Sequence, residues 1–263
     1  MSFVLKPNPL KKAIKEGKTV FGIYVSIPSP MIIELAAEAG MDFVRIDAYH
    51  SPLDLYQTQH MIRAAEARGI VPIVRVHKDA QKIQSLLEMG AMGLVIPDVA
   101  TPEDARFAVN ATRFMPVGER GMFSASRDSG YGAAPTDAYA KWSNEEVQLT
   151  IQVESAEGVA NAEKILAQPG IDFVASGRGD LSQSLGLTGQ RNHPKVIEAE
   201  KRIFDVARAN GKAIAVLVDG MAPNFTDSVQ EWIAKGVNLI VVGVDISILR
   251  KTFSGIVAKA RGK

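Results

Sequence analysis

Five side chains suited to acid–base or metal chemistry stand at the ends of short apolar runs. Asp47 and His50 follow the run FVRI within the stretch RIDAYHSPLD, and Arg75 lies near the end of IVPIVRV. Glu154 follows VQLTIQV directly, and Asp180 comes shortly after IDFVAS. Carboxylates, an imidazole and a guanidinium can transfer protons, stabilise an anion and bind a hard metal ion. These residues are candidates for an active site, provided that the runs end at one edge of a sheet.

Glu154 and Asp180 could together bind a divalent cation. They follow consecutive apolar runs, and adjacent parallel strands lie roughly 4.8 Å apart. Two neighbouring carboxylates repel each other, whereas a hard cation accepts both and leaves positions for water and a chelating substrate. Oxygen ligands favour Mg²⁺ or Mn²⁺, with Co²⁺ or Ni²⁺ as substitutes. The alternative is that Glu154 merely stabilises the start of the next helix, ESAEGVANAEKIL, and spacing alone does not decide.

Asp47 and His50 could form a proton-transfer pair. A carboxylate that accepts a hydrogen bond from one ring nitrogen fixes the tautomer and makes the other nitrogen more basic. Arg75 could stabilise an oxyanion beside them. Structural alternatives exist for all three, namely a helix cap or loop acceptor for Asp47, a satisfied rim residue for His50, and a surface ion pair for Arg75.

The elements that would position these residues alternate regularly along the chain. Short β-branched runs alternate with longer segments of helical periodicity, which is typical of βα units around a parallel sheet. Glycines after several helical segments, such as Gly40, Gly69 and Gly90, favour left-handed helix ends. The expected strands are residues 19–25, 43–46, 70–76, 93–97, 147–153, 171–176, 212–218 and 238–243. Eight such strands predict one α/β domain, residues 1–263, folded as a (β/α)8 TIM barrel whose C-terminal strand ends surround one pocket.

Two connections are longer than a barrel requires. They are residues 116–146 and residues 177–193. Long loops inside a compact fold are usually functional or mobile. We therefore expect both at the rim of the pocket.

Composition narrows the class of protein. Lys and Arg number 30 against 29 Asp and Glu, so no charge excess indicates nucleic acid or a membrane surface as a partner. The chain has no cysteine, which excludes disulfides, thiolate metal sites and a cysteine nucleophile. The opening MSFVLKPNPLKKAIKEG lacks the pattern of a signal peptide, and the longest apolar runs are too short to span a bilayer. We expect a soluble cytoplasmic protein that acts on a small molecule.

Together, these segments resemble the HpcH/HpaI aldolase family of metal-dependent pyruvate aldolases along nearly the whole chain. Each matching piece is weak alone, but their order and spacing are specific. The pieces are FGIYVSIPSPMIIELAAEAGMDFVRIDAYHSP, PIVRV, LLEMGAMGLVIPDV, PVGERG, IQVES and SGRGDLSQSLGLTGQRNHP. The resemblance implies a barrel that reversibly cleaves a 4-hydroxy-2-oxoacid to pyruvate and an aldehyde through a metal-bound pyruvate enolate.

The resemblance also implies which residues bind the metal and the substrate. Glu154 and Asp180 would bind Mg²⁺ or Mn²⁺, with Co²⁺ as an alternative, and pyruvate would chelate the ion through its carboxylate and keto oxygens. The backbone amides of Gly179 and Asp180 would hold the substrate carboxylate. Gln152 is assigned to the substrate with them.

Three residues carry the catalytic roles that the resemblance implies. Arg75 would stabilise the enolate oxygen. His50, supported by Asp47, would act as acid and base on the aldol hydroxyl, by way of a metal-bound water.

The sequence departs from the family pattern at two places in the expected pocket. Tyr49 stands before His50 where the family usually has glutamate, and the usual G-P-A-D reads Gly177, Arg178, Gly179 and then aspartate. Arg178 could recruit a second acidic group of the substrate, or it could turn away and pair with an acid.

Other activities remain as alternatives. A Claisen-type lyase or synthase, related to citrate and malyl lyases, would use the same metal–enolate site. A Schiff-base aldolase needs a lysine at a strand end, for which Lys78 is the one candidate. The tripeptide RGD at 178–180 could be a cell-adhesion ligand, and the chain could be a binding or structural barrel without catalysis.

The resemblance further implies an assembly. Members exchange the last helix between subunits and form a homo-hexamer, a dimer of trimers. The terminal segment SILRKTFSGIVAKARGK is amphipathic enough to pack on a neighbouring subunit, although its sequence does not say which one.

Overall fold

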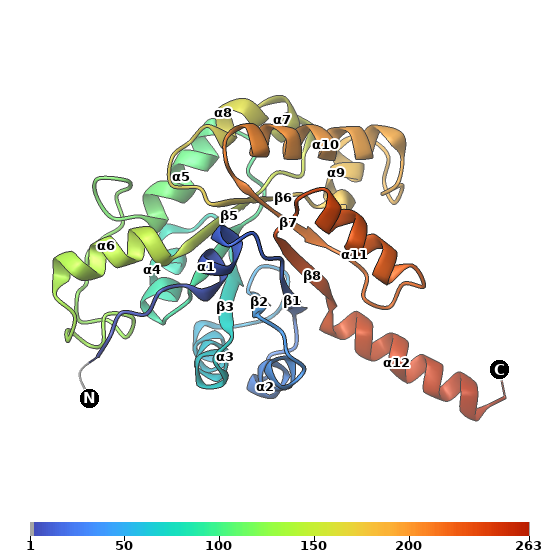
Figure 1. Ribbon diagram of the computed structural model, residues 1–263, viewed down its shortest axis with the longest axis horizontal. Coiled ribbons are helices and arrows are strands. Elements are labelled where there is room, and N and C mark those ends of the chain that lie inside the picture. Colours follow the sequence, from blue (N-terminus) through green and yellow to red (C-terminus); the bar gives the residue numbers. More distant parts are fainter. Residues whose placement is uncertain (1–2, 263) are drawn as a thin grey trace.

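Eight parallel strands close into a barrel in which each strand pairs with its neighbours in chain order, and β1 pairs with β8 (Figure 1). The computed structural model describes residues 3–262. The strands are β1 (Val20–Val25), β2 (Phe43–Asp47), β3 (Val71–Arg75), β4 (Gly93–Ile96), β5 (Gln148–Gln152), β6 (Phe173–Ala175), β7 (Ala213–Leu217) and β8 (Leu239–Val244). The predicted (β/α)8 barrel is confirmed, and each predicted strand is found at its place within about two residues.

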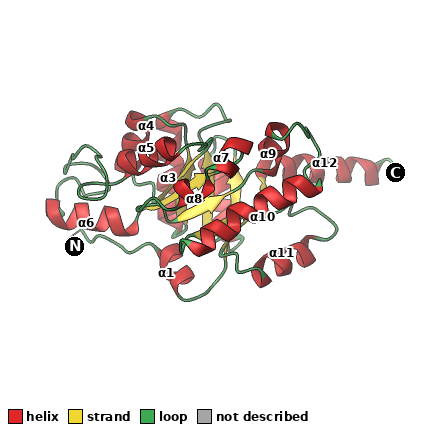
Figure 2. Ribbon diagram, turned by 90° about the horizontal axis from the view of Figure 1, so that it is seen from above, coloured by secondary structure: helices red, strands yellow, loops and turns green. Residues whose placement is uncertain are grey.

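Helices surround the barrel and are stopped or started by the residues expected to do so (Figure 2). Gly69 ends one helix in the left-handed conformation, with φ of 75°. Thr101 caps another and accepts a hydrogen bond from the backbone of Asp104. The helices are α1 (Pro9–Lys15), α2 (Pro30–Glu38), α3 (Leu55–Arg68), α4 (Ala80–Glu88), α5 (Pro102–Thr112), α6 (Thr136–Glu146), α7 (Ala156–Ala160), α8 (Ala162–Leu166), α9 (Arg178–Ser184), α10 (Pro194–Ala209), α11 (Phe225–Ala234) and α12 (Asp245–Ala260).

The two sides of each strand face different surroundings. On β2, Val44 and Ile46 belong to the apolar layer between strands and helices, whereas Phe43 belongs to the apolar cluster inside the barrel. Because side chains alternate along a strand, Arg45 and Asp47 point to the same side as Phe43, into the barrel. Leu10 of α1 joins the interior cluster. The barrel interior is therefore apolar at its N-terminal end and polar towards the C-terminal strand ends.

The two long connections lie at opposite ends of the barrel. Residues 177–193 follow β6 and contribute several residues to the cavity at the C-terminal strand ends, as expected. The expectation for residues 116–146 is wrong, because this connection runs from the end of α5 to the start of β5, at the N-terminal end. There the backbone N–H of Asp128 bonds to the carbonyl of Glu88, at the end of α4. Figure 1 shows the connection, which includes α6, beside α4.

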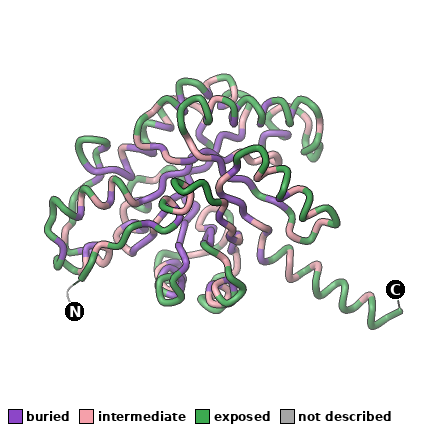
Figure 3. The backbone as a smooth tube through the Cα atoms, in the orientation of Figure 1, coloured by how far each residue is buried: buried purple, intermediate pink, exposed green. Residues whose placement is uncertain are grey.

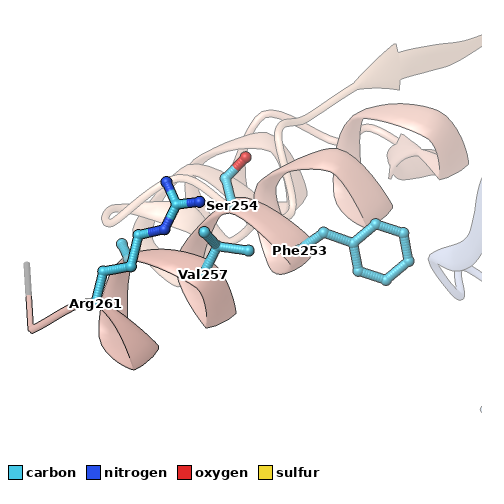
Figure 4. Close-up of a pocket in the computed structure, with 5 residues that line it drawn as sticks. Phe253, Ser254, Val257 and Arg261 are labelled. Carbon is cyan, nitrogen blue, oxygen red and sulfur yellow. The ribbon is translucent and has the colours of Figure 1, made fainter.

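The C-terminal helix α12 extends away from the barrel (Figures 1 and 2). Most of it is exposed (Figure 3), and Asp245 in its first turn is its one buried residue. Phe253 and Ile256, 60% and 59% exposed, lie on it. A shallow pocket on this helix is lined by Phe253, Ser254, Val257, Ala258 and Arg261 (Figure 4). No helix within residues 3–262 combines the length and apolarity that crossing a bilayer requires.

Candidate active site

A cavity of about 950 Å³ opens at the C-terminal strand ends and collects most of the predicted residues. Glu154 is the exception, since it lies just behind the cavity wall, against Gln152 and Gly177. Its Oε2 accepts a hydrogen bond of 2.8 Å from Nε2 of Gln152. The predicted residues that line the cavity are Asp47, His50, Arg75, Gln152, Gly179 and Asp180.

Glu154 and Asp180 do approach each other, as predicted. A Cβ atom added to Gly177 would overlap Oε2 of Glu154 and would lie 3.4 Å from Oδ2 of Asp180. The alternative role of Glu154 as a helix cap is wrong, because the capping side chain of α7 is Ser155, which accepts a hydrogen bond from Gly158. Glu154 is thus available for a ligand.

The burial of Glu154 and the charges near it also change its pKa. It is 5% exposed. Burial raises the pKa of Glu154 to about 7, and the nearby charges of Asp180 and Asp98 add to the effect, while a hydrogen bond of 3.3 Å from the backbone of Asp98 opposes it. A carboxylate with this pKa gains from a cation beside it, because the cation favours its ionised form.

The donor set fits a hard divalent cation that is shared with a substrate. Within residues 3–262 no three His, Cys, Asp or Glu side chains converge, so the chain offers two carboxylates. Two carboxylates, completed by water and substrate oxygens, are a common set for Mg²⁺. The small residue Gly177 keeps the space between them free of a side chain, and Oε1 of the neighbouring Gln152 is buried without a hydrogen-bond partner.

Substituting Gly177 by alanine tests this arrangement. The backbone of Gly177, with φ of −101° and ψ of 96°, accepts an alanine, so any effect comes from the overlap with Glu154. We expect Mn²⁺ affinity, measured by calorimetry, to fall by about tenfold or more, since one carboxylate must move. Gly121→Ala is the control, because its Cβ would meet Gln84 at an ordinary 3.4 Å. Equal Mn²⁺ affinity of both variants and wild type would show that this space holds no ion.

Asp47 and Arg75 form a buried ion pair beside this site. Nε of Arg75 donates to Oδ1 of Asp47 at 3.1 Å, and Nη2 to Oδ2 at 3.4 Å. The two residues are 2% and 6% exposed, and they lie opposite each other on β2 and β3. Although burial lowers the pKa of Arg75, the hydrogen bond to Asp47 raises it overall. Nη1 makes no hydrogen bond within residues 3–262, which leaves one edge of the guanidinium for a ligand.

The expected hydrogen bond between Asp47 and the His50 ring is absent. Oδ1 of Asp47 instead accepts from the backbone N–H groups of Tyr49 and His50, at 3.1 and 3.2 Å. Arg75 donates to both oxygens of the same carboxylate, so Asp47 orients the guanidinium and the turn that carries His50. The His50 side chain reaches the cavity with no hydrogen bond to its ring within residues 3–262.

Tyr49 contacts several residues at the rim of the cavity. Its ring packs against His50 and His77, at centroid distances of 4.4 and 4.3 Å. The guanidinium of Arg75 lies 4.9 Å from the ring centroid, and the hydroxyl donates to Asp98. Asp98 was missed by the sequence analysis, although it directly follows the predicted strand 93–97 and so stands at the same edge as the other candidates.

The sequence left open the orientation of Arg178 and the role of Lys78, and both side chains are found in ion pairs. Arg178 pairs with Glu200, at 2.9 Å from Nε, and lies over the ring of Trp232, so it turns towards an acid. Lys78 bonds to Asp104 at 2.6 Å and is not among the residues that line the cavity. A Schiff-base mechanism needs a lysine amine that reaches the substrate, and Lys78 is instead held by an acid away from the cavity.

The closed parallel barrel, with its polar cavity at the C-terminal strand ends, is of the TIM-barrel type. The family model described as HpcH/HpaI aldolase/citrate lyase matches residues 20–252. The chain therefore belongs to the HpcH/HpaI aldolase/citrate lyase family, as the resemblance implied, and is an enzyme of the carbon–carbon lyase class.

Individual relatives agree with this assignment. The chain is 35% identical over 260 residues to the hydroxypyruvate/pyruvate aldolase of Roseobacter denitrificans, covering 96% of each chain. It is 35% identical over 243 residues to the 2-keto-3-deoxy-L-rhamnonate aldolase of Escherichia coli K12, covering 92% of this chain and 88% of the relative. The crystal structure of the citrate synthase SbnG matches with a TM-score of 0.86 at 33% identity, covering 96% and 97%.

A more distant structure shares the fold. The CitE protein of Mycobacterium tuberculosis, described in complex with magnesium and acetate, matches with a TM-score of 0.58 at 15% identity, covering 89% of this chain and 88% of that one. At this identity the likeness concerns the fold alone.

Proposed function

We propose that this chain, acting as one barrel domain of residues 1–263, is a divalent-metal-dependent aldolase. It reversibly cleaves a 4-hydroxy-2-oxoacid to pyruvate and an aldehyde. The observation that carries the proposal is the approach of the Glu154 and Asp180 carboxylates around Gly177, at the wall of a cavity that Asp180, Arg75 and His50 line. The aldolase relatives support the reaction class.

The chain's own residues account for the bond cleavage. His50 removes the proton from the C4 hydroxyl, the C3–C4 bond breaks, and its electron pair passes into the 2-oxo group, which leaves an aldehyde and a pyruvate enolate. Nη1 of Arg75 faces the developing charge, held in place by Asp47. The enolate then takes up a proton at C3.

The start of α9 holds the carboxylate end of the substrate. The N–H groups of Gly179 and Asp180 lie in its first turn, where no carbonyl of the helix can accept them. A carboxylate placed there receives two hydrogen bonds. Gln152 lines the cavity beside them and is assigned to the substrate as well.

Glu154 and Asp180 would hold the cation, Mg²⁺ or Mn²⁺ by preference and Co²⁺ as a substitute. When bound, the cation supplies a Lewis acid that polarises the 2-oxo group. Without it the two carboxylates oppose each other, which is one cause of the raised pKa of Glu154.

Metal uptake should depend on pH through Glu154. Its pKa of about 7 means that a proton competes with the cation below this pH. We expect the apparent Mn²⁺ affinity to fall by about tenfold for each unit of pH between 6.5 and 5.5, and to level off above pH 8. Calorimetry across this range measures the effect.

The folding stability of the metal-free protein should change with pH in the opposite direction to its metal affinity. Because folding raises the pKa of Glu154, the carboxyl stabilises the fold below its unfolded pKa, and this contribution is lost as pH rises to about 7. The difference in melting temperature between wild type and Glu154→Gln isolates this effect. A pH-independent Mn²⁺ affinity would contradict the role of Glu154.

The test of the proposed function is a pyruvate-release screen. Straight-chain, sugar-derived and dicarboxylic 4-hydroxy-2-oxoacids would be offered with Mg²⁺, Mn²⁺, Co²⁺ or EDTA. We expect pyruvate from at least one class, with loss of activity in EDTA and recovery on adding metal. Equal activity with EDTA would overturn metal dependence, and no release from any class would overturn the aldolase assignment.

A Claisen-type lyase or synthase is the second candidate. It is favoured by the likeness to SbnG, which is described as a citrate synthase. The site would then stabilise the enolate of an acyl thioester, which adds to the carbonyl group of a second substrate, in place of the enolate of pyruvate. Acyl-thioester cleavage or formation without pyruvate release from hydroxy-oxoacids would favour this candidate.

We also propose a homo-hexamer, a dimer of trimers, in which α12 is exchanged between subunits. The projecting helix, with its exposed Phe253 and Ile256, supports this assembly. Met31 and Leu35 of α2, 65% and 58% exposed, offer an apolar surface of the kind that such a helix would cover. Native mass spectrometry tests the subunit number. We retain the cytoplasm as the proposed location, which cell fractionation would test.

A further inference from the structure

Arg45 lies inside the barrel and takes no part in the mechanism above. It is on β2, two residues before Asp47 on the same face of the strand, and it lines the catalytic cavity. Two residues along a strand correspond to roughly 6.6 Å. Arg45 therefore approaches the cavity from below the pair of Asp47 and Arg75. Phe43, fully buried, lies two residues deeper and belongs to the apolar floor.

Within residues 3–262, Arg45 is the one buried arginine that makes no salt bridge, although the charges of Asp47 and Glu154 act on it from a greater distance. It is 5% exposed, and its Nε is buried with no hydrogen-bond partner. The other three buried arginines each have a carboxylate, since Arg75 pairs with Asp47, Arg113 with Asp172, and Arg120 lies 3.7 Å from Asp128. Each of those three guanidinium charges is balanced by a carboxylate of the protein, whereas the guanidinium of Arg45 has no salt-bridge partner.

An unpaired buried cation is costly unless something compensates it. Burial lowers the pKa of Arg45 to about 10, so the guanidinium is still charged near neutral pH. A charge kept in a low-dielectric site without a partner favours the binding of an anion there. Arg45 stands beside Tyr24 in the register of β1 and β2, and the Tyr24 side chain also lines the cavity.

The position of Arg45 identifies which part of a substrate it would meet. The proposed cradle for the 2-oxoacid carboxylate, the N–H groups of Gly179 and Asp180, follows β6. In a closed barrel of eight strands in sequential order, β2 and β6 are four strands apart and lie across the barrel from each other. A substrate whose carboxylate is held after β6 therefore presents its other end towards Arg45.

We propose that Arg45 is a specificity-determining residue that binds a second carboxylate on the substrate, carried by the aldehyde half. The inference rests on the proposed aldolase function. One guanidinium next to a tyrosine suits a singly charged carboxylate better than a doubly charged phosphate, because planar bidentate pairing of guanidinium with carboxylate satisfies both groups. The aldehyde released would then be an oxoacid.

The test compares two substrates that differ only at the far end. 4-Hydroxy-2-oxoglutarate carries a carboxylate where 4-hydroxy-2-oxopentanoate carries a methyl group. We expect wild type to prefer the first, and Arg45→Met to lower its kcat/KM by about 10²-fold, as loss of a buried charge pair does. For the second substrate the change should stay within about threefold. Arg45→Lys, which keeps the charge without the planar fork, should recover part of the lost preference.

If Arg45→Met lowered kcat/KM equally for both substrates, the inference would be overturned, since Arg45 would then act on the whole site. An unchanged preference in Arg45→Met would overturn it as well. Should Arg45→Met fail to fold, the same comparison made with Arg45→Lys decides, because a lost bidentate contact must reduce the preference for the dicarboxylate.

Binding of unreactive ligands separates this inference from the proposed function. Calorimetry with glutarate and butyrate, in EDTA, needs neither metal nor turnover. Wild type should bind glutarate more tightly than butyrate, and Arg45→Met should bind both alike. If neither hydroxy-oxoacid is cleaved but this difference is seen, the aldolase proposal fails and the anion site stands. If the difference is absent in wild type, the anion site fails regardless of catalysis.

Discussion

Glu154→Gln is expected to lower kcat/KM for pyruvate release by about 10³-fold or more, even with saturating Mn²⁺. Glutamine keeps the shape of the side chain but removes the negative charge, and a neutral amide oxygen binds a hard cation far less well than a carboxylate. Within residues 3–262 no third His, Cys, Asp or Glu side chain joins Glu154 and Asp180 in a group that could hold a metal, so none can compensate. Coupled assay of pyruvate measures the rate, and calorimetry of the same variant measures Mn²⁺ affinity.

Glu157→Gln is the matched control for this substitution. It makes the same chemical change three residues further along, at an exposed position in the first turn of α7. We expect its activity to stay within about twofold of wild type, because surface substitutions rarely matter. Retention of half the activity or more in Glu154→Gln would refute the assignment of Glu154 as a metal ligand.

His50→Ala is expected to slow aldol cleavage by about 10² to 10⁴-fold, the usual contribution of a general acid–base group. Metal affinity should not change, because the His50 ring makes no hydrogen bond to Glu154 or Asp180. The sharper readout is exchange of the C3 protons of pyruvate in D₂O, followed by NMR. That exchange needs enolate formation but no C4 hydroxyl, so it should persist in His50→Ala and disappear in Glu154→Gln.

His60→Ala controls for loss of an imidazole elsewhere. His60 lies on α3 with its ring against Tyr56, and it is not among the residues that line the cavity. It should leave both cleavage and exchange unchanged. If His50→Ala loses less than threefold in cleavage, another group carries the proton; if cleavage and exchange fall together, His50 acts on the enolate and not on the hydroxyl.

The fold could be predicted because its signals are local. Each strand is a β-branched run flanked by helix caps and glycine stops, and these features depend on neighbours within a few residues. The misplacement of residues 116–146 shows the limit of length as a criterion. The connection follows a helix and precedes a strand, and in a barrel such connections lie at the end away from the active site. Its place in the order of elements was the better indicator.

The candidate site could be located from the sequence, but its hydrogen bonds could not. Strand ends bring Asp47, Arg75 and Glu154 to one edge whatever their partners are. Which group Asp47 binds depends on register, and the pairing of Asp47 with Arg75 across β2 and β3 decides the competition against the His50 ring. Arg45 had a usable signal, since alternation from Asp47 places it inside the barrel, where an arginine requires an explanation.

The apolar layer at the N-terminal end of the barrel interior limits how small molecules enter and leave the cavity. Phe43, Ile73 and Leu239 are fully buried beneath the cavity, and Leu10 of α1 packs against the same layer. These side chains fill the N-terminal end of the barrel interior. The substrate enters and both products depart by one mouth, so the fragment nearer the opening must leave before the other can follow.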